Sequence, residues 1–106
     1  MATKHDVLQA LQHHIGKANA IGGKELAGFC GLSDTRPLRH ITDELIEDGI
    51  ALCSHPSNGY WIAANASELQ ETVDFHHGRA MHELQKVSKL SKIPLPDLLG
   101  QLHLRT

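Results

Sequence analysis

The sequence has few of the features that mark enzymes or membrane proteins. Its 106 residues include one tryptophan, one tyrosine and two phenylalanines. No apolar run approaches the roughly 20 residues that a membrane-spanning helix needs. The first residues lead into an amphipathic pattern and not into a secretion signal, so we expect a cytoplasmic protein. No glycine-rich phosphate loop, nucleophile motif or convergent pair of carboxylates is present, and the sequence therefore predicts a protein that is not an enzyme.

Metal-binding spacings are missing as well. The two cysteines, Cys30 and Cys53, fall at apolar positions of expected core elements, which is typical of reduced, buried cysteines. Neither cysteine has another two residues away, and no two of the nine histidines are four residues apart. Zinc sites use such spacings. We therefore expect no metal and no cofactor, and we expect the histidines to lie mainly on the surface.

A surplus of positive charge is the third missing feature. Ten Lys and Arg against twelve Asp and Glu give a formal net charge of −2. Dedicated nucleic-acid-binding proteins are usually basic, but where the charges lie matters more than their sum. The length predicts a single domain with an appendage.

What the sequence does contain is a pattern of two short helices followed by a hairpin. The first helix is expected to end before Gly31, where a helix end favours a residue that tolerates positive φ. Asp34 can cap the second helix, and Pro37 requires that this helix begin only a residue or two earlier. The apolar residues of the second helix recur at helical spacing and predict one buried stripe: Leu38, Ile41, Leu45 and Ile46.

The second half of the pattern predicts the hairpin. Gly49 ends the helix, and residues 50–54 and 60–63 favour strands. Asn58-Gly59 between them is the strongest short signal for a hairpin turn. Trp61, in the returning strand, is expected in the core. Two helices joined by a short turn and followed by a hairpin predict a winged helix-turn-helix.

The flanking segments predict two further helices. Residues 3–15 form an amphipathic pattern with Ile15 in its buried stripe, and Ala20-Ile21 is expected to pair with the hairpin. A long helix from about residue 68 to 92 exceeds what a small domain can cover, so its apolar residues, together with leucines near the C-terminus, predict self-association. These residues are Leu69, Val73, Ala80, Leu84, Val87, Leu90, Leu98, Leu99 and Leu102.

Several short segments over roughly residues 24–102 carry a resemblance to a known family. They lie in the helix-turn-helix, in the hairpin (the wing) and in the C-terminal part of the chain, and together they are more specific than a helix-turn-helix pattern alone. They are Arg36, Leu38, Arg39 and Ile41, the pairs Asp48-Gly49 and Arg79-Ala80, and the runs Cys53-Ser54-His55-Pro56, Gly59-Tyr60-Trp61-Ile62-Ala63 and Leu95-Pro96-Asp97-Leu98-Leu99-Gly100-Gln101-Leu102. In these segments the chain resembles a family of small winged-helix proteins encoded by phages and prophages. The resemblance implies a DNA-binding fold and no particular target.

The second helix of the pattern is the candidate recognition helix, because the N-terminal part of such a helix reaches base edges in the major groove. An arginine there can bind guanine or a phosphate with two hydrogen bonds. In the alternative, the arginines pair with Asp34, Asp43 or Glu44 on a solvated face. The hairpin has no Lys or Arg, so we expect its contribution to be small. The candidate nucleic-acid-binding residues are Lys24, Thr35, Arg36, Arg39, His40, Asp43, His55, Ser57 and Asn58.

The whole sequence predicts a mainly α-helical protein with a small β-hairpin. Residues 1–64 are expected to form a winged helix-turn-helix domain. Residues 65–106 are expected to form a helical arm for self-association, made of a long helix and a short terminal one. We expect the protein to bind double-stranded DNA as a homodimer and to regulate phage or prophage transcription. The alternative is a winged-helix adaptor that binds a phage or host protein in replication, assembly or host takeover, without binding DNA.

Overall fold

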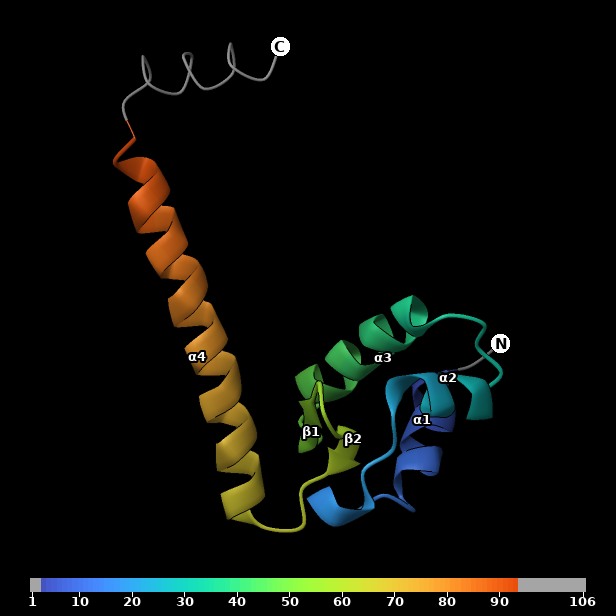
Figure 1. Cartoon of the computed structure of the whole chain (residues 1–106). Helices are drawn as coiled ribbons and strands as arrows, with labels where there is room; N and C mark the ends of the chain where they lie inside the picture. Colours follow the sequence, from blue (N-terminus) through green and yellow to red (C-terminus); the bar gives the residue numbers. More distant parts are fainter. Residues whose placement is uncertain (1–2, 94–106) are drawn as a thin grey trace. The chain divides into compact units, whose positions relative to one another are not determined.

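The computed structural model describes residues 3–93, which form four α-helices, a short 3-10 helix and one β-hairpin (Figure 1). The chain divides into two compact units between Val73 and Asp74, inside the last helix. The predicted mainly helical chain with a small hairpin is confirmed. The expected terminal helix, with Leu98, Leu99 and Leu102, lies outside the described residues.

Helix α1 extends over Lys4–Leu11 and is shorter than the sequence predicts. It begins where expected, because the side chain of Thr3 caps its first turn. The predicted extension to residue 15 is wrong. The carbonyl of His14 accepts a hydrogen bond from the N–H of Ile62 at 2.9 Å. The helix gives way to a turn at residues 12–14, after which Ile15 pairs with Ile62 of the hairpin, and Ile15 is 46% exposed and not buried.

The 3-10 helix η1 (Lys17–Asn19) leads through a short loop to α2 (Gly23–Phe29). The end of α2 is the one expected from the sequence. Gly31 has a φ of +75°, and the next N–H, that of Leu32, donates to the carbonyl of Ala27 at 2.8 Å. This hydrogen bond closes the last turn of the helix in the manner of a glycine-terminated helix.

Helix α3 extends over Thr35–Glu47. The carboxylate of Asp34 accepts a hydrogen bond from the N–H of Arg36 at 2.9 Å, which satisfies a backbone donor in the first turn. Gly49, with a φ of +90°, follows the helix. The N–H of Ile50 donates to a carbonyl in the last turn at 3.0 Å, so α3 ends in the same way as α2.

The buried stripe of α3 differs from the prediction at two positions. Leu38 and Leu45 are buried and Ile41 is half-buried, as expected. Ile46, however, is 47% exposed, and Thr42 is buried in the stripe. The Thr42 hydroxyl donates to a backbone carbonyl one turn earlier at 2.9 Å, so the buried polar group has a partner.

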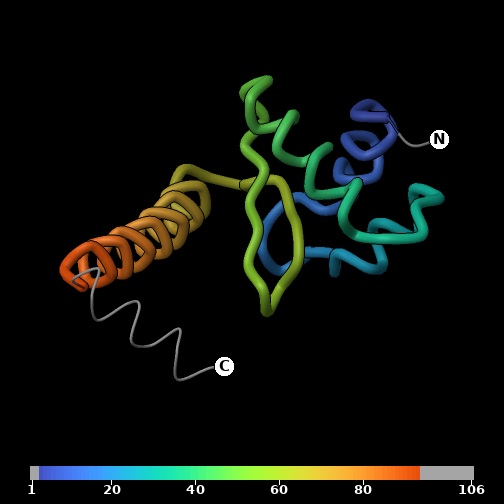
Figure 2. The backbone as a smooth tube through the Cα atoms, turned by 90° about the horizontal axis from the view of Figure 1, so that it is seen from above, coloured from blue at the N-terminus to red at the C-terminus, as the bar shows by residue number. Residues whose placement is uncertain are grey.

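Strands β1 (Leu52–His55) and β2 (Gly59–Ile62) pair antiparallel. Figure 2 shows the loop between them projecting from the first unit. On the other edge of β2, Ile21 exchanges two backbone hydrogen bonds with Tyr60, at 2.7 and 2.9 Å. The predicted pairing of this segment with the hairpin is therefore confirmed.

The turn of the hairpin is not the predicted turn centred on Asn58-Gly59. The N–H of Asn58 donates to the carbonyl of His55 at 3.1 Å, which places Pro56 at the second position of a β-turn. Gly59 follows with a φ of +95°. A Cβ at Gly59 would overlap the carbonyl oxygen of Ile21. Glycine is therefore required there both by its φ and by the approach of the neighbouring backbone.

The core of the first unit is apolar and receives side chains from α1, α2, α3, β1 and the loop before α2. Its buried members are Val7, Leu11, Ile21, Leu26, Ala27, Leu38, Leu45 and Leu52. Trp61 is 2% exposed, which confirms its predicted place in the core. Cys53 is also buried, and burial raises the pKa of its thiol. Both cysteines are free.

Helix α4 extends over Ala66–Ser91 and begins inside the first unit. The side-chain oxygen of Asn65 accepts a hydrogen bond from the N–H of Glu68 at 2.9 Å, which caps the helix. Thr72, one turn later, is buried. The first unit thus includes the first two turns of α4. The boundary predicted from the sequence, at residue 64, assigns these two turns to the arm instead. No helix within residues 3–93 has the length and apolar character to cross a membrane.

Candidate nucleic-acid interface

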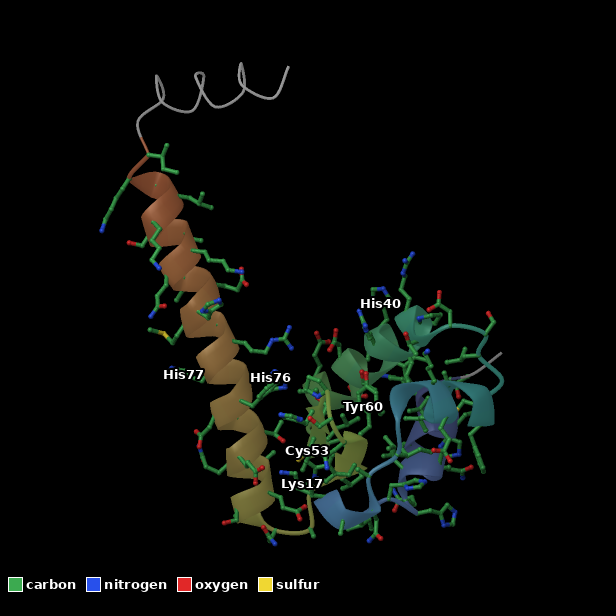
Figure 3. The ribbon with its side chains drawn as sticks, in the orientation of Figure 1. Lys17, His40, Cys53, Tyr60, His76 and His77 are labelled. Atoms are coloured by element: carbon green, nitrogen blue, oxygen red, sulfur yellow. The ribbon has the colours of Figure 1, made fainter. Side chains whose placement is uncertain are left out.

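Four of the predicted residues lie along one exposed face of α3. Arg36, Arg39, His40 and Asp43 follow one another at intervals that place them on the same side of a helix, and all four are exposed. Figure 3 shows His40 on the side of α3 that faces away from α1 and α2. The buried stripe on the opposite side fixes this face outward.

The two arginines of this face form no ion pair with any residue between 3 and 93. The pairing with neighbouring acids that the sequence left open is not observed. Asp34 accepts its hydrogen bond from the backbone N–H of Arg36. Glu44 lies 3.9 Å from the Nζ of Lys4. Both the Arg36 and the Arg39 guanidinium groups are therefore available to an external ligand.

Acidic residues at the C-terminal end of α3 form ion pairs with Lys4 of α1. The Nζ of Lys4 lies 3.0 Å from Oδ2 of Asp48, and this hydrogen bond, reinforced by the charge of Asp48, raises the pKa of Lys4. Glu44 adds a second, longer contact to the same amine. Negative charge is thus gathered at the C-terminal end of α3 and partly neutralised there. The N-terminal half, with Arg36 and Arg39, bears the positive charge.

The N-terminal ends of α2 and α3 meet at a cleft of about 520 Å³. Lys24, from the first turn of α2, and Thr35, from the first turn of α3, both line it; the remaining lining residues are Ala27, Leu32, Ser33 and Asp34. The structure therefore brings Lys24 to the end of α3 where the arginines lie. Lys24 itself is exposed and forms no ion pair among the residues that the structure describes.

Tyr60, which we did not predict as a site residue, approaches the starts of α2 and α3 at Gly23. A Cβ on Gly23 would be 3.4 Å from Cε2 of Tyr60 and 3.9 Å from Cγ2 of Thr35. The starts of α2 and α3 and the strand β2 thus approach one another closely at a glycine. Its position in the sequence does not distinguish Tyr60 from a core residue, because it is half-buried and packs against the apolar core.

Of the predicted hairpin residues, two are exposed and one has a local partner. Ser57 and Asn58 lie exposed in the loop. His55 is half-buried, and its ring Nδ1 accepts a hydrogen bond from the N–H of Ser57 at 3.1 Å. His55 therefore stabilises the turn, while the Ser57 hydroxyl and the Asn58 amide remain available as donors to a phosphate.

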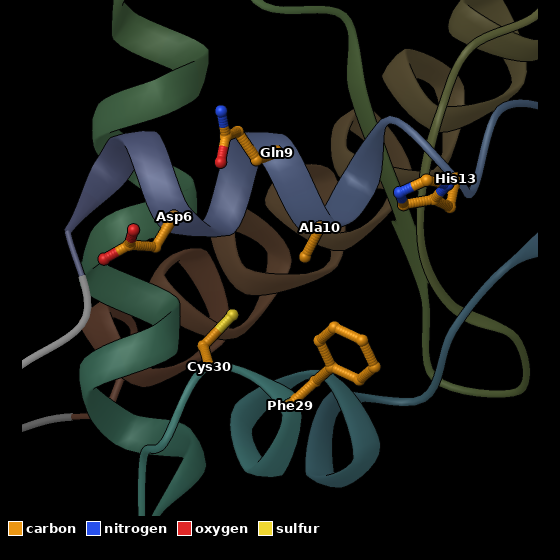
Figure 4. A pocket seen from close by; sticks show the side chains of 6 residues that line it. All are labelled: Asp6, Gln9, Ala10, His13, Phe29 and Cys30. Atoms are coloured by element: carbon orange, nitrogen blue, oxygen red, sulfur yellow. The ribbon is translucent and has the colours of Figure 1, made fainter.

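A second surface feature, along α1 and at the C-terminal end of α2, was not predicted. Phe29 is 76% exposed at the end of α2 and lines a cavity of about 370 Å³ between the two helices (Figure 4). The other lining residues are Asp6, Gln9, Ala10, His13 and Cys30. Burial raises the pKa of the Cys30 thiol.

Within residues 3–93 no group of three or more His, Cys, Asp or Glu side chains is arranged to hold a metal ion. No family model, no curated protein and no solved structure matches this chain.

Proposed function

We propose that the chain is a small winged helix-turn-helix protein that binds duplex DNA, with α3 as the recognition helix. Helices α2 and α3, the short turn between them and the hairpin that follows α3 are the elements that such a fold requires. The resemblance to phage and prophage winged-helix proteins supports a role in transcription within a phage or prophage.

One observation supports DNA binding above all: the outward face of α3 presents Arg36 and Arg39 without acidic partners among residues 3–93. The N-terminal part of a recognition helix contacts base edges, and an arginine there can donate two hydrogen bonds to guanine O6 and N7. Asp43, one turn further along, can accept from the amino group of cytosine. His40 and Thr35 complete the surface that would enter the groove.

The remaining candidates would bind the phosphate backbone. Lys24 is placed beside the start of α3, where a phosphate on the groove edge would lie. Ser57 and Asn58 offer neutral donors from the hairpin loop. Such contacts fix the position of the protein on the duplex but do not read its sequence. The proposal therefore assigns specificity to α3 and register to Lys24 and the hairpin.

We propose that the protein acts as a homodimer through the apolar face of α4. This face consists of Leu69, Val73, Ala80, Leu84 and Val87, with Leu90 beside it. All six are exposed, and Leu84 and Val87 are 59% and 57% exposed. A row of exposed apolar side chains of this kind, interrupted by His76 and His77, is rare on monomers, and its near-heptad spacing fits a second, identical helix. A dimer would present two copies of α3 to one duplex.

The proposal is tested by selecting bound fragments from a pool of random duplexes with the purified protein. Enrichment of a defined sequence is expected for the natural chain, and Arg36→Ala with Arg39→Ala should abolish it. The matched control is Arg36→Lys with Arg39→Lys. Lysine keeps the charge but not the planar two-donor geometry, so this variant should retain DNA binding and lose the guanine preference. Equal enrichment by all three proteins would disprove the assignment of α3.

A second function is favoured by a different observation. The first unit, residues 1–73, contains five basic and nine acidic residues, and Phe29 stands exposed beside a cavity. Exposed aromatic side chains next to pockets are typical anchors of protein interfaces. A winged-helix adaptor that binds a phage or host protein would explain both features. Under that function, Phe29→Ala would abolish binding of the partner protein, and replacement of Arg36 and Arg39 would leave that binding unchanged.

A further inference from the structure

The side of α4 opposite its apolar face is basic. Arg79, His82, Lys86 and Lys89 follow one another at intervals of three, four and three residues, which places them in one row along the helix. We call this row the basic stripe. All four side chains are exposed. His82, Lys86 and Lys89 each follow a residue of the apolar face, Ala80, Leu84 and Val87, by two positions. Two positions correspond to a rotation of about 200° around a helix of 3.6 residues per turn, so the basic stripe lies opposite the apolar face.

The charge of this segment differs in sign from that of the first unit. Residues 74–93 contain four basic residues, the fourth being Lys92, and two acidic ones, Asp74 and Glu83. Asp74 and Glu83 stand on the flanks of the helix, between the two rows, so the basic stripe itself contains no acid. A helix with a merely solvated surface usually interleaves both signs along the same row.

Ion pairing leaves most of the stripe available. Lys86 lies 3.3 Å from Oε1 of Glu83, but both side chains are more than half exposed, so a competing anion could replace this weak pair. Lys89 forms no ion pair with any residue between 3 and 93. The guanidinium of Arg79 lies 5.7 Å from the centre of the Phe75 ring, a contact that leaves its outer N–H groups free to donate.

We infer that the basic stripe of α4 is a second nucleic-acid contact, which binds the phosphate backbone of DNA without reading its sequence. Three cationic side chains spread over about 15 Å of helix, at 1.5 Å per residue, match a regular row of phosphates better than a single small anion. The inference rests on the proposed function in one respect, since DNA is chosen as the polyanion because α3 is proposed to bind it.

The geometry disfavours a lipid surface as the ligand. A helix that lies on a membrane inserts its apolar face, and its basic residues must then reach the headgroups from the sides of that face. Here the basic stripe is on the opposite side and would point into water. If the apolar face is covered by a second copy of the helix, both basic stripes point outward, where two stretches of phosphate backbone could bind them.

The test measures binding of the full chain to a labelled duplex of random sequence as the salt concentration is varied. The arm variant is Arg79→Gln with Lys86→Gln and Lys89→Gln, and its control is Arg79→Lys with Lys86→Arg and Lys89→Arg, which keeps the charge. Loss of three phosphate contacts should reduce the log–log salt slope by about 2.7 per chain, because each contact contributes about 0.9. The control should keep the slope of the natural chain.

The head variant Arg36→Ala with Arg39→Ala separates this inference from the proposed function. If the arm variant keeps the full slope while the head variant loses affinity, the inference is wrong and the proposed function stands. If only the arm variant loses affinity, the inference stands and α3 is not the DNA-binding element. If neither loses affinity, both are wrong. Sedimentation of the arm variant completes the test. A changed oligomeric state would show that the stripe binds the acidic first unit of another copy, which would overturn the inference.

Discussion

The carboxylate of Glu68 accepts hydrogen bonds from the backbone N–H of Lys17, with both of its oxygens 3.2 Å from that nitrogen. The N–H of Ala64 donates to the same carboxylate at 3.0 Å. These two backbone hydrogen bonds hold the pKa of Glu68 below its usual range, and the bond from Ala64 has the larger effect. The indole N–H of Trp61 lowers this pKa further, although it forms no hydrogen bond with any residue between 3 and 93. A single side chain thus joins η1, the end of the hairpin and the start of α4.

Replacing Glu68 by Gln is expected to lower the melting temperature at neutral pH. A carboxyl whose pKa is lowered by folding stabilises the folded state above its unfolded pKa, and this contribution is lost as the pH falls through the folded value. The difference between the natural chain and Glu68→Gln should therefore shrink below the ordinary pKa of 4.5. Thermal unfolding followed by circular dichroism at neutral and acidic pH measures it. Glu71→Gln is the control, because Glu71 only pairs with the exposed amine of Lys17, and it should have little effect at any pH.

Gly59→Ala is expected to destabilise the hairpin strongly. Its φ of +95° costs any other residue about 1–2 kcal/mol, and the added Cβ would overlap the carbonyl oxygen of Ile21. We expect a loss above about 2 kcal/mol in the free energy of unfolding measured with urea. Gly28→Ala is the matched control. Nothing lies within 4 Å of its Cβ position in α2, so this variant should be as stable as the natural chain or slightly more stable.

Two substitutions in α3 distinguish its buried face from its exposed one. Leu38 is fully buried, and Leu38→Ala should lower the free energy of unfolding by about 2–5 kcal/mol, because it leaves a cavity in the core. Ile46→Ala should cost no more than about 0.5 kcal/mol, because almost half of Ile46 is in contact with solvent. Chemical denaturation of both variants measures the difference. Comparable losses would show that Ile46 lies in the stripe that the sequence predicts.

The parts of the fold that were predicted correctly depend on local chemistry. The ends of α2 and α3 follow from Gly31 and Gly49, whose φ values few other residues adopt, and the start of α3 follows from the cap that Asp34 provides. The errors depend on contacts between distant segments. Residues 12–15 continue a helical pattern in the sequence, but the backbone of His14 and Gly16 forms hydrogen bonds with Ile62, which no local pattern can indicate.

The candidate site also has a part that local sequence predicts and a part that it does not. The helical spacing of the apolar residues in α3 defines its inner face, and this suffices to place Arg36 and Arg39 together on the outer face. The meeting of Lys24 with Thr35 and of Gly23 with Tyr60 depends on how α2, α3 and β2 pack. The exposed position of Phe29 has the same origin, since its spacing alone does not distinguish a buried from an exposed aromatic residue.

The last prediction concerns self-association through α4. Leu84 lies in the middle of the apolar face and is 59% exposed, so a monomer leaves most of it in water. In a two-stranded helical pair it would be buried, and a carboxylate at this position would then face apolar side chains without a partner. Burying an unpaired charge costs several kcal/mol, which is enough to dissociate a micromolar dimer. We therefore expect the natural chain to sediment as a dimer at micromolar concentration and Leu84→Asp to sediment as a monomer.

Gln85→Asp is the matched control, because it introduces the same charge one residue later, about 100° around the helix from Leu84 and away from the apolar face. This variant should remain dimeric, and both variants should keep the unfolding temperature of the first unit, since residues 84 and 85 lie outside it. Dissociation by Gln85→Asp as well would indicate a general effect of negative charge on α4. A natural chain that sediments as a monomer would refute the dimer, and the apolar face of α4 would then require a partner other than a second copy.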